Sequence, residues 1–223
     1  MRLPVRLAVF DCDGTLVDGQ ADVCWAMERA FTRAGLAAPD AAAVRRMVGL
    51  SLPVAIRHLA PDLDEAQNRA VTEFYKSSFR ARREEGLLDE PLYDGIAELL
   101  TALHDGGWSL AVATGKSDRG LAACLATHGI TDLFVSLQTA DRHPSKPHPA
   151  MLEAALFEAG AAPHQAVMIG DTSFDMLMAR SAGVRAVGVA WGYHAPAELL
   201  ASGAFSVADT VAALAQALEE TLG

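Results

Sequence analysis

The chain has 223 residues, enough for one large α/β domain or for a compact core with a second, smaller domain. Hydrophobic residues make up 51% and charged residues 21% of the sequence, which excludes a disordered or low-complexity protein. The formal net charge of −10 disfavours a nucleic-acid partner, because proteins that bind nucleic acids use positive charge to neutralise phosphates.

The cysteines and the hydropathy pattern indicate where the protein works. The three cysteines, at positions 12, 24 and 124, show neither a CxxC spacing nor an even number that would pair fully. This favours a reducing compartment. No apolar run approaches the ~18–20 residues of a membrane span, and Asp11 interrupts the apolar start of the chain. We therefore expect a cytoplasmic protein without a membrane partner.

Five short apolar runs alternate with helix-length segments. Each run is nearly continuous in hydrophobicity, as in parallel strands that are covered on both faces. This alternation predicts an α/β fold with a doubly wound, Rossmann-like parallel sheet. The predicted strands are Leu7–Phe10, Leu110–Ala113, Leu133–Leu137, Val167–Ile169 and Val187–Ala190. The predicted helices between the later strands are Gly95–His104, Arg119–Thr127, Pro149–Ala159 and Phe174–Ala182.

The gap between the first two predicted strands is far longer than one crossover helix requires. It contains helical patterns over Ala21–Ala34, Ala41–Val48, Leu52–Leu59 and Glu65–Arg83. We predict that residues 20–85 form an inserted all-helical cap, while residues 1–19 and 86–223 form the α/β core. The two crossings, Val17–Gly19 and Gly86–Pro91, would then act as hinges.

Two aspartates follow the first predicted strand, in the run Asp11-Cys12-Asp13-Gly14-Thr15. Side chains two residues apart on an extended chain point the same way, so Asp11 and Asp13 would present paired carboxylates at the carboxyl end of the strand. Ligands of open α/β sheets bind at this edge. The alternative is a capped turn with two solvated aspartates.

The second predicted strand ends in Thr114-Gly115-Lys116-Ser117, which is similar to the end of a Walker A loop. That loop needs a glycine five positions before Gly115, and position 110 is leucine, so the interpretation as a nucleotide loop fails. A threonine hydroxyl and backbone amides at a strand–helix junction remain suited to holding a phosphate oxygen. A simple helix N-cap is the alternative.

Two later junctions carry charged groups. Lys146 lies in a proline-stiffened loop, where its ammonium can neutralise both a carboxylate and a phosphate, unless it is a solvated loop lysine. Asp171 and Asp175 lie four residues apart at a predicted helix start, and so on one face of that helix. Oxygen ligands without nearby cysteine, and with no histidine at zinc spacing, suit Mg²⁺. Helix capping by acidic residues is the alternative.

All four junctions follow strands on the same edge of the predicted sheet, and chance capping predicts no such convergence of complementary groups. The order of these motifs resembles the haloacid dehalogenase (HAD) superfamily of aspartate-nucleophile hydrolases over nearly the whole chain. The insert looks like the cap of that family. The stretch from Asp171 to Trp191-Gly192-Tyr193 resembles the phosphoglycolate phosphatase group most closely.

The resemblance implies a role for each motif. Asp11 matches the nucleophile, Asp13 the general acid/base and Asp171 a magnesium ligand. True dehalogenases lack the second aspartate, so the presence of Asp13 favours phosphoester chemistry. The residues with implied roles are Asp11, Asp13, Thr114 and Lys146 in catalysis, Thr114, Gly115, Lys116 and Lys146 in phosphate binding, and Asp11, Asp13, Asp171 and Asp175 in Mg²⁺ binding.

These motifs lead us to expect a Mg²⁺-dependent phosphatase acting through an aspartyl-phosphate intermediate. Its partner would be a small phosphorylated metabolite, either phosphoglycolate-like or a sugar phosphate, and the protein would be a monomer or a homodimer. Two alternatives stay open. One is a sugar-phosphate mutase of the β-phosphoglucomutase type, and the other is a non-catalytic protein that senses phosphate or metal.

The cap offers few signals for the substrate. Arg45, Arg46 and His58 flank the turn Gly49–Pro53 and could meet a substrate carboxylate or hydroxyl, although solvated helix faces are the more common role of such residues. We expect the turn Gly49–Pro53 to meet the core near Asp11 when the cap is closed.

Overall fold

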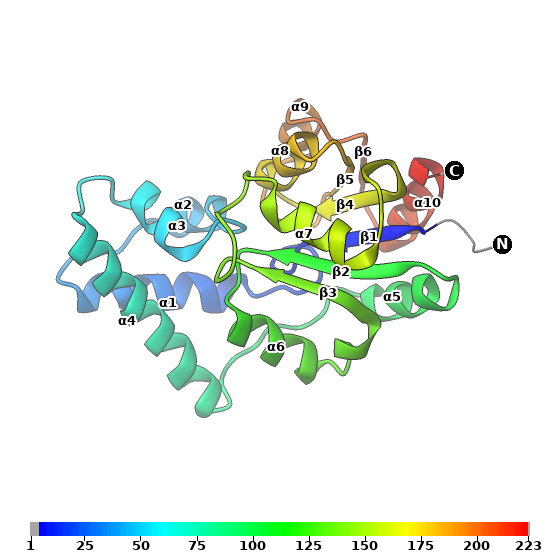
Figure 1. The fold of residues 1–223 in the computed structure, drawn as a ribbon. Helices are drawn as coiled ribbons and strands as arrows, with labels where there is room; N and C mark the ends of the chain where they lie inside the picture. The colour runs from blue at the N-terminus through cyan, green and yellow to red at the C-terminus, as the bar shows by residue number, and fades with distance from the viewer. Residues whose placement is uncertain (1–4, 223) are drawn as a thin grey trace.

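A computed structural model describes residues 5–222, and the centre of this part of the chain is a sheet of six parallel strands (Figure 1). The strands follow the order β3-β2-β1-β4-β5-β6. Their bounds are β1 (Leu7–Phe10), β2 (Ser109–Thr114), β3 (Phe134–Thr139), β4 (Ala166–Gly170), β5 (Arg185–Val189) and β6 (Ser206–Ala208). The α/β fold with a parallel sheet predicted from the sequence is confirmed, and all five predicted strands are present within a few residues of their predicted bounds.

Helices cover both faces of the sheet because alternate residues of the strands point to opposite sides. In β1, Ala8 and Phe10 are buried in one hydrophobic cluster, and Leu7 and Val9 in another. The first cluster includes residues of α5 (Ile96–Asp105), α6 (Asp118–Thr127) and α10 (Val211–Leu222). The second includes residues of α7 (Ala150–Ala159), α8 (Ser173–Ser181) and α9 (Pro196–Ala201). The short 3₁₀ turns η1 (Thr131–Leu133) and η2 (Pro163–Gln165) precede β3 and β4.

Four of the five helices between β1 and β2 form an insert that lies beside the sheet (Figure 1). They are α1 (Gln20–Arg33), α2 (Ala41–Arg46), α3 (Leu52–Leu59) and α4 (Glu65–Glu84). These helices share a hydrophobic cluster of their own, separate from the two clusters of the sheet. The side chain of Asp40 caps the start of α2, and Asp64 forms a capping box with Gln67 at the start of α4.

The two chain segments that join these helices to the core run side by side. The backbone N–H of Asp18 donates to the carbonyl of Pro91 at 2.8 Å, and the N–H of Tyr93 donates to the carbonyl of Leu16 at 3.0 Å. The insert is thus attached through one narrow, hydrogen-bonded neck. The residues at which core and cap divide stay a prediction of the sequence.

The order of the strands fixes where the site lies. The chain leaves β1 toward β2 and β3 on one side, and then crosses to β4, β5 and β6 on the other, so the direction reverses between the neighbouring strands β1 and β4. In doubly wound sheets, the crevice for ligands lies at the carboxyl ends of the strands where this reversal occurs. Asp11 directly follows β1, and Asp171 directly follows β4.

No helix in residues 5–222 combines the length and apolar character that crossing a membrane requires.

Candidate active site

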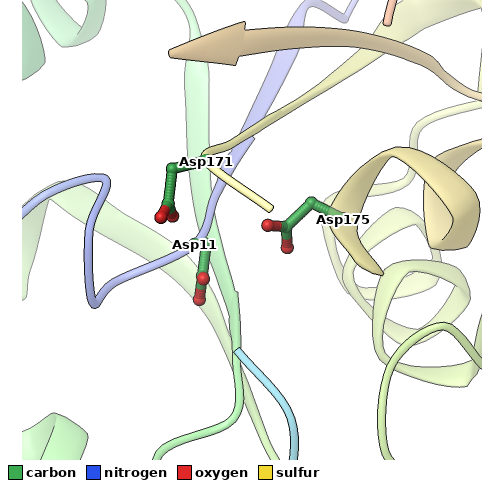
Figure 2. A group of neighbouring side chains, drawn as sticks. All are labelled: Asp11, Asp171 and Asp175. Atoms are coloured by element: carbon green, nitrogen blue, oxygen red, sulfur yellow. The ribbon is translucent and has the colours of Figure 1, made fainter. Parts of the chain in front are cut away.

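Three buried aspartates meet at the switch point of the sheet. Asp11 comes from the end of β1, Asp171 from the end of β4 and Asp175 from the first turn of α8 (Figure 2). Carboxylate oxygens of all three lie within 4.8 Å of one another. The backbone N–H of Asp11 donates to the carbonyl of Ile169 at 2.9 Å, which extends the pairing of β1 with β4 by one residue and fixes this acid at the edge.

Lys146 is the cation of this group. Its Nζ lies 2.9 Å from Oδ1 of Asp11 and donates to Oδ1 of Asp175 at 2.6 Å, and no part of its side chain is exposed. Burial alone would lower the pKa of Lys146, but the neighbouring carboxylates of Asp11 and Asp175 outweigh burial and raise it above the ordinary value. The ammonium is therefore charged throughout the neutral range.

Asp171 is held by groups on both sides. The hydroxyl of Thr15 donates to its Oδ1, and the backbone N–H of Tyr193 donates to its Oδ2, each at 2.9 Å. Gly192 approaches so closely that a Cβ at that position would collide with the Asp171 side chain. Burial, followed by the charges of Asp11 and Asp175, raises the pKa of Asp171 well above its ordinary value. Sequence reasoning missed the part played by the backbone of Tyr193.

The charges of the group do not balance on their own. Burial raises the pKa of Asp11 from 3.8 to about 7, although Lys146 opposes the shift. Neither carboxylate oxygen of Asp11 accepts a well-aligned hydrogen bond. Three ionised carboxylates around one ammonium leave net negative charge in a buried space, and an all-oxygen donor set is the kind that Mg²⁺ binds. The residues present thus fit a magnesium ion held by Asp11, Asp171 and Asp175.

Asp13 lies outside this group of three, although it was predicted as a fourth metal-binding residue. Its Oδ1 lies 2.9 Å from Nζ of Lys116, and the same Nζ donates to Oε1 of Glu90 at 2.5 Å. Burial lowers the pKa of Lys116, but Asp13 and Glu90 together raise it well above the ordinary value. The ammonium of Lys116 therefore pairs with Asp13 and Glu90. The predicted contact of Lys116 with phosphate stays a prediction.

Sequence reasoning missed Glu90, which is almost fully buried. It precedes Pro91 in the second predicted hinge, Gly86–Pro91. An acidic residue in such a segment is ordinarily exposed to solvent. Its burial follows from the fold, because the carbonyl of Glu90 also meets the Nε2 of His128 at 2.8 Å, just after α6.

Thr114 and Gly115 lie where the cap meets the core. Thr114 is buried at the end of β2, and its hydroxyl accepts from the backbone N–H of Lys116 at 3.3 Å. The carbonyl groups of the cap turn lie directly over Gly115, and the N–H of Ser51 donates to Oγ of Ser145 at 2.8 Å. The turn Gly49–Pro53 therefore contacts the core beside the site, as the sequence led us to expect.

We predict that Gly115→Ala impairs closure of the cap. A Cβ at this position would lie 2.5 Å from the carbonyl oxygen of Leu50, so the cap turn must move outward by about 1 Å. Steady-state kinetics should show kcat/KM lowered by about 10²-fold, since misplacement of this size carries that penalty. Magnesium affinity should be unchanged, because Gly115 touches no carboxylate of the group. Wild-type kcat/KM in a folded variant would show that this contact plays no part in catalysis.

A cavity of about 260 Å³ lies between the cap and the core. Asp11, Asp13, Thr114 and Lys116 line its core side. None of the three cap residues singled out in the sequence lines it. His58 is exposed, and Arg46 forms an ion pair with Glu198 of α9 at 3.0 Å, so it joins cap to core. Arg45 instead lines a second, separate hollow with Trp191 and Tyr193.

The parallel sheet, the buried acids at its switch point and the helical insert define an α/β protein with a candidate active site between the sheet and the insert. The chain belongs to the haloacid dehalogenase-like hydrolases, since the sequence model of that family matches residues 8–189. The resemblance drawn from the motifs is confirmed, as is the expectation of an enzyme.

Relatives and solved structures agree with this assignment. The chain is 35% identical over 209 residues to the probable phosphatase IndB of Dickeya dadantii (strain 3937), covering 92% of this chain and 89% of that protein. It is 30% identical over 218 residues to a phosphoglycolate phosphatase of Vibrio vulnificus (strain YJ016), covering 94% of each. A predicted phosphatase from Clostridium acetobutylicum shares the fold, with a TM-score of 0.88, 24% identity and coverage of 98% of this chain and 100% of that one.

Proposed function

We propose that this protein is a Mg²⁺-dependent phosphatase that hydrolyses a small phosphomonoester through an aspartyl-phosphate on Asp11. The observation that carries the proposal is the setting of Asp11, which is buried at the core side of the cavity, 2.9 Å from Nζ of Lys146, with no well-aligned hydrogen bond to its oxygens. A carboxylate that faces a cavity and has an ammonium beside it can attack phosphorus to form a covalent intermediate. The names of the relatives, which are phosphatases, support the same class of reaction.

The first step, attack of Asp11 on phosphorus, depends mainly on neutralisation of negative charge. A phosphomonoester dianion must approach the carboxylate of Asp11, and like charges in a buried site repel strongly. Lys146 supplies one positive charge at 2.9 Å from the attacking group. A magnesium ion held by Asp11, Asp171 and Asp175 would supply the rest when bound. Asp11 then attacks phosphorus in line with the leaving oxygen.

We assign the proton transfers of the reaction to Asp13. In its acid form it would donate to the leaving oxygen, and in its carboxylate form it would take a proton from the water that cleaves the aspartyl-phosphate. Asp13 lines the same cavity as Asp11 but contacts a different ammonium, that of Lys116. Separate partners let the two aspartates carry out different roles.

The test of the proposal is an assay of a panel of phosphomonoesters with Mg²⁺, in which released phosphate and isomerised product are both measured. Release of inorganic phosphate, together with a phosphorylated Asp11 detected by mass spectrometry of quenched enzyme, is the expected result. Isomerised product without free phosphate would identify a mutase instead. Binding of phosphate esters without turnover would identify a sensor.

We predict that Asp13→Asn lowers the rate of enzyme phosphorylation more with alkyl phosphates than with p-nitrophenyl phosphate as the substrate. An alkoxide must be protonated as it leaves, whereas the nitrophenolate ion leaves unaided. Loss of a general acid costs about 10²- to 10⁴-fold for the alkyl substrate. Removal of the phosphoryl group should be slow for both substrates, so the phosphorylated enzyme should accumulate. Equal losses in the two pre-steady-state phosphorylation rates, with no trapped intermediate, would refute this role.

We predict that Mg²⁺ stabilises the protein more at pH about 8 than at pH about 5. The folded protein without metal holds a proton on Asp11 up to about pH 7, whereas the unfolded chain releases it near pH 3.8. The free energy of unfolding therefore falls as the pH rises between these values. Metal binding needs the ionised carboxylates, so its contribution grows over the same range.

Thermal unfolding with Mg²⁺ and with a chelator at the two pH values measures this contribution. Asp171→Asn is the matched control, since it removes one ligand charge at nearly constant volume, and it should abolish most of the difference. An equal rise in Tm at both pH values, or a rise retained in Asp171→Asn, would contradict the metal site.

A further inference from the structure

The cavity between cap and core has two chemically different sides. The core side carries charged and polar groups, including Asp11, Asp13, Thr114 and Lys116. The cap side is built mainly from aliphatic and aromatic side chains. They are Val23 and Met27 of α1, Val44 of α2, Met47, Val48 and Leu50 of the following turn, Leu52 and Ala55 of α3, and Tyr75 and Phe79 of α4.

Polar side chains on the cap side are few and confined to one helix. They are Lys76, Arg80 and Arg83, together with the phenol of Tyr75, and all four belong to α4. Lys76 and Arg80 are exposed, which places their charges where the cavity meets solvent. Cations at that position attract a phosphate dianion toward a cavity in a protein of net charge −10.

Side-chain hydrogen-bond acceptors are nearly absent from the cap side of the cavity. No carboxylate, amide or imidazole of residues 20–85 lines the cavity, and the phenol of Tyr75 is the one side-chain oxygen that this segment contributes. A sugar that enters such a space exchanges its water contacts for methyl and methylene groups and leaves hydroxyl donors unpaired, which is costly. An apolar group meets the opposite situation and gains from leaving water.

Part of the cap wall is still open to solvent. Met47, Leu52 and Phe79 are only partly buried, and all three line the cavity. The cap has its own hydrophobic cluster, so these side chains present apolar surface beyond what that cluster covers. A bound molecule with an apolar part would cover this surface.

We propose that the substrates are phosphomonoesters whose alcohol part is apolar, an alkyl or aromatic group that packs against Met47, Leu52 and Phe79. This inference rests on the phosphatase function proposed above and names its substrate class. The phosphate faces Asp11 on the core side, and the alcohol part fills the cap side. A hexose would leave hydroxyl groups unpaired against this wall.

Matched pairs of substrates test the proposal because the two members of each pair are esters of the same type and differ mainly in the polarity of the alcohol part. Cyclohexylmethyl phosphate and glucose 6-phosphate both carry a six-membered ring on a phosphorylated methylene group. Isobutyl phosphate and phosphoglycolate form a second pair, in which two methyl groups replace the carboxylate oxygens. We expect kcat/KM to favour the apolar member of each pair at least about tenfold, since each buried methylene group contributes about fourfold. p-Nitrophenyl phosphate serves as the general phosphatase assay.

The outcomes separate this inference from the proposed function. Hydrolysis of p-nitrophenyl phosphate together with equal or greater kcat/KM for glucose 6-phosphate and phosphoglycolate would overturn the substrate class and leave the phosphatase intact. Absence of hydrolysis for all five compounds would overturn the proposed function and this inference with it.

Two substitutions locate the selectivity. Met47→Gln and Leu52→Asn keep the size of each side chain nearly constant and add a donor and an acceptor to the cap wall. Each should lower the ratio of kcat/KM between cyclohexylmethyl phosphate and glucose 6-phosphate by at least about fourfold. Leu200→Asn, at an exposed position of α9 outside the cavity, is the matched control and should leave the ratio unchanged. An unchanged ratio in both folded cap variants would overturn the proposal.

Discussion

Asp11→Asn should lower turnover by at least about 10⁴-fold while the protein stays folded and the cavity stays accessible. An amide oxygen is a very poor nucleophile toward phosphorus, and the two neighbouring carboxylates are held by other contacts. Asp171 is fixed by two hydrogen bonds, and Asp175 accepts from the backbone and hydroxyl of Thr172 as well as from Lys146. The measurement is steady-state release of phosphate from p-nitrophenyl phosphate.

Thermal stability of the metal-free variant is the control that separates loss of the nucleophile from loss of the fold. Burial raises the pKa of Asp11 to about 7, so ionising it at pH about 8 works against folding, and an uncharged amide avoids this cost. The metal-free variant should therefore unfold at a temperature no lower than that of the wild type. Asp62→Asn, at an exposed position of the cap, should leave turnover unchanged. Turnover of Asp11→Asn within tenfold of wild type would remove Asp11 as the nucleophile.

Lys146→Met should both inactivate and destabilise the enzyme. The ammonium lies between Asp11 and Asp175 with no exposure, and removing one partner of a buried ion pair costs about 3–5 kcal/mol because the remaining charges are uncompensated. Methionine fills most of the same volume, so the loss reports charge rather than a cavity. Turnover should fall by at least about 10³-fold, since the phosphate then meets unscreened carboxylates.

The pH dependence of the lost stability identifies the cause of that loss. Lys146 lowers the pKa of Asp11, so without it the folded protein keeps its carboxyl protons to higher pH. The deficit in free energy of unfolding should therefore be largest at pH about 8 and shrink toward pH about 5, where protonation removes the uncompensated charge. Urea unfolding of the metal-free proteins measures it. Lys76→Met, at an exposed lysine, should cost less than about 1 kcal/mol. An equal deficit at both pH values would show that lost packing is responsible.

The convergence of the acidic and basic residues could be predicted from the sequence because parallel strands end on one edge. Asp11 and Asp171 directly follow strands that read clearly as continuous apolar runs, so their meeting required only the order of strands. β6, by contrast, has three residues, and neither its hydrophobicity nor its length distinguishes it from a loop. Neither α9 nor α10, the helices on either side of β6 in the chain, was predicted from the sequence.

The different surroundings of Asp11 and Asp13 could not be predicted. Strand alternation places the two side chains on one side of the chain, but the strand ends at Phe10. Beyond it, the N–H groups of Leu16 and Val17 both donate to the carbonyl of Cys12 and close a tight turn, so the alternation does not continue. Both acids still line the cavity, but each has its own ammonium. Such partners follow from tertiary packing, which residue spacing does not encode.

Glu90 connects the neck between cap and core to the active site through Lys116. This carboxylate belongs to the chain segment by which the cap returns to the core, and it holds the ammonium that touches Asp13. If the cap rotated far enough about its neck to move Glu90, Lys116 would keep its contact with only one of the two carboxylates, Glu90 or Asp13. In that case the position of the cap would set the charge beside Asp13, the residue to which we assign proton transfer.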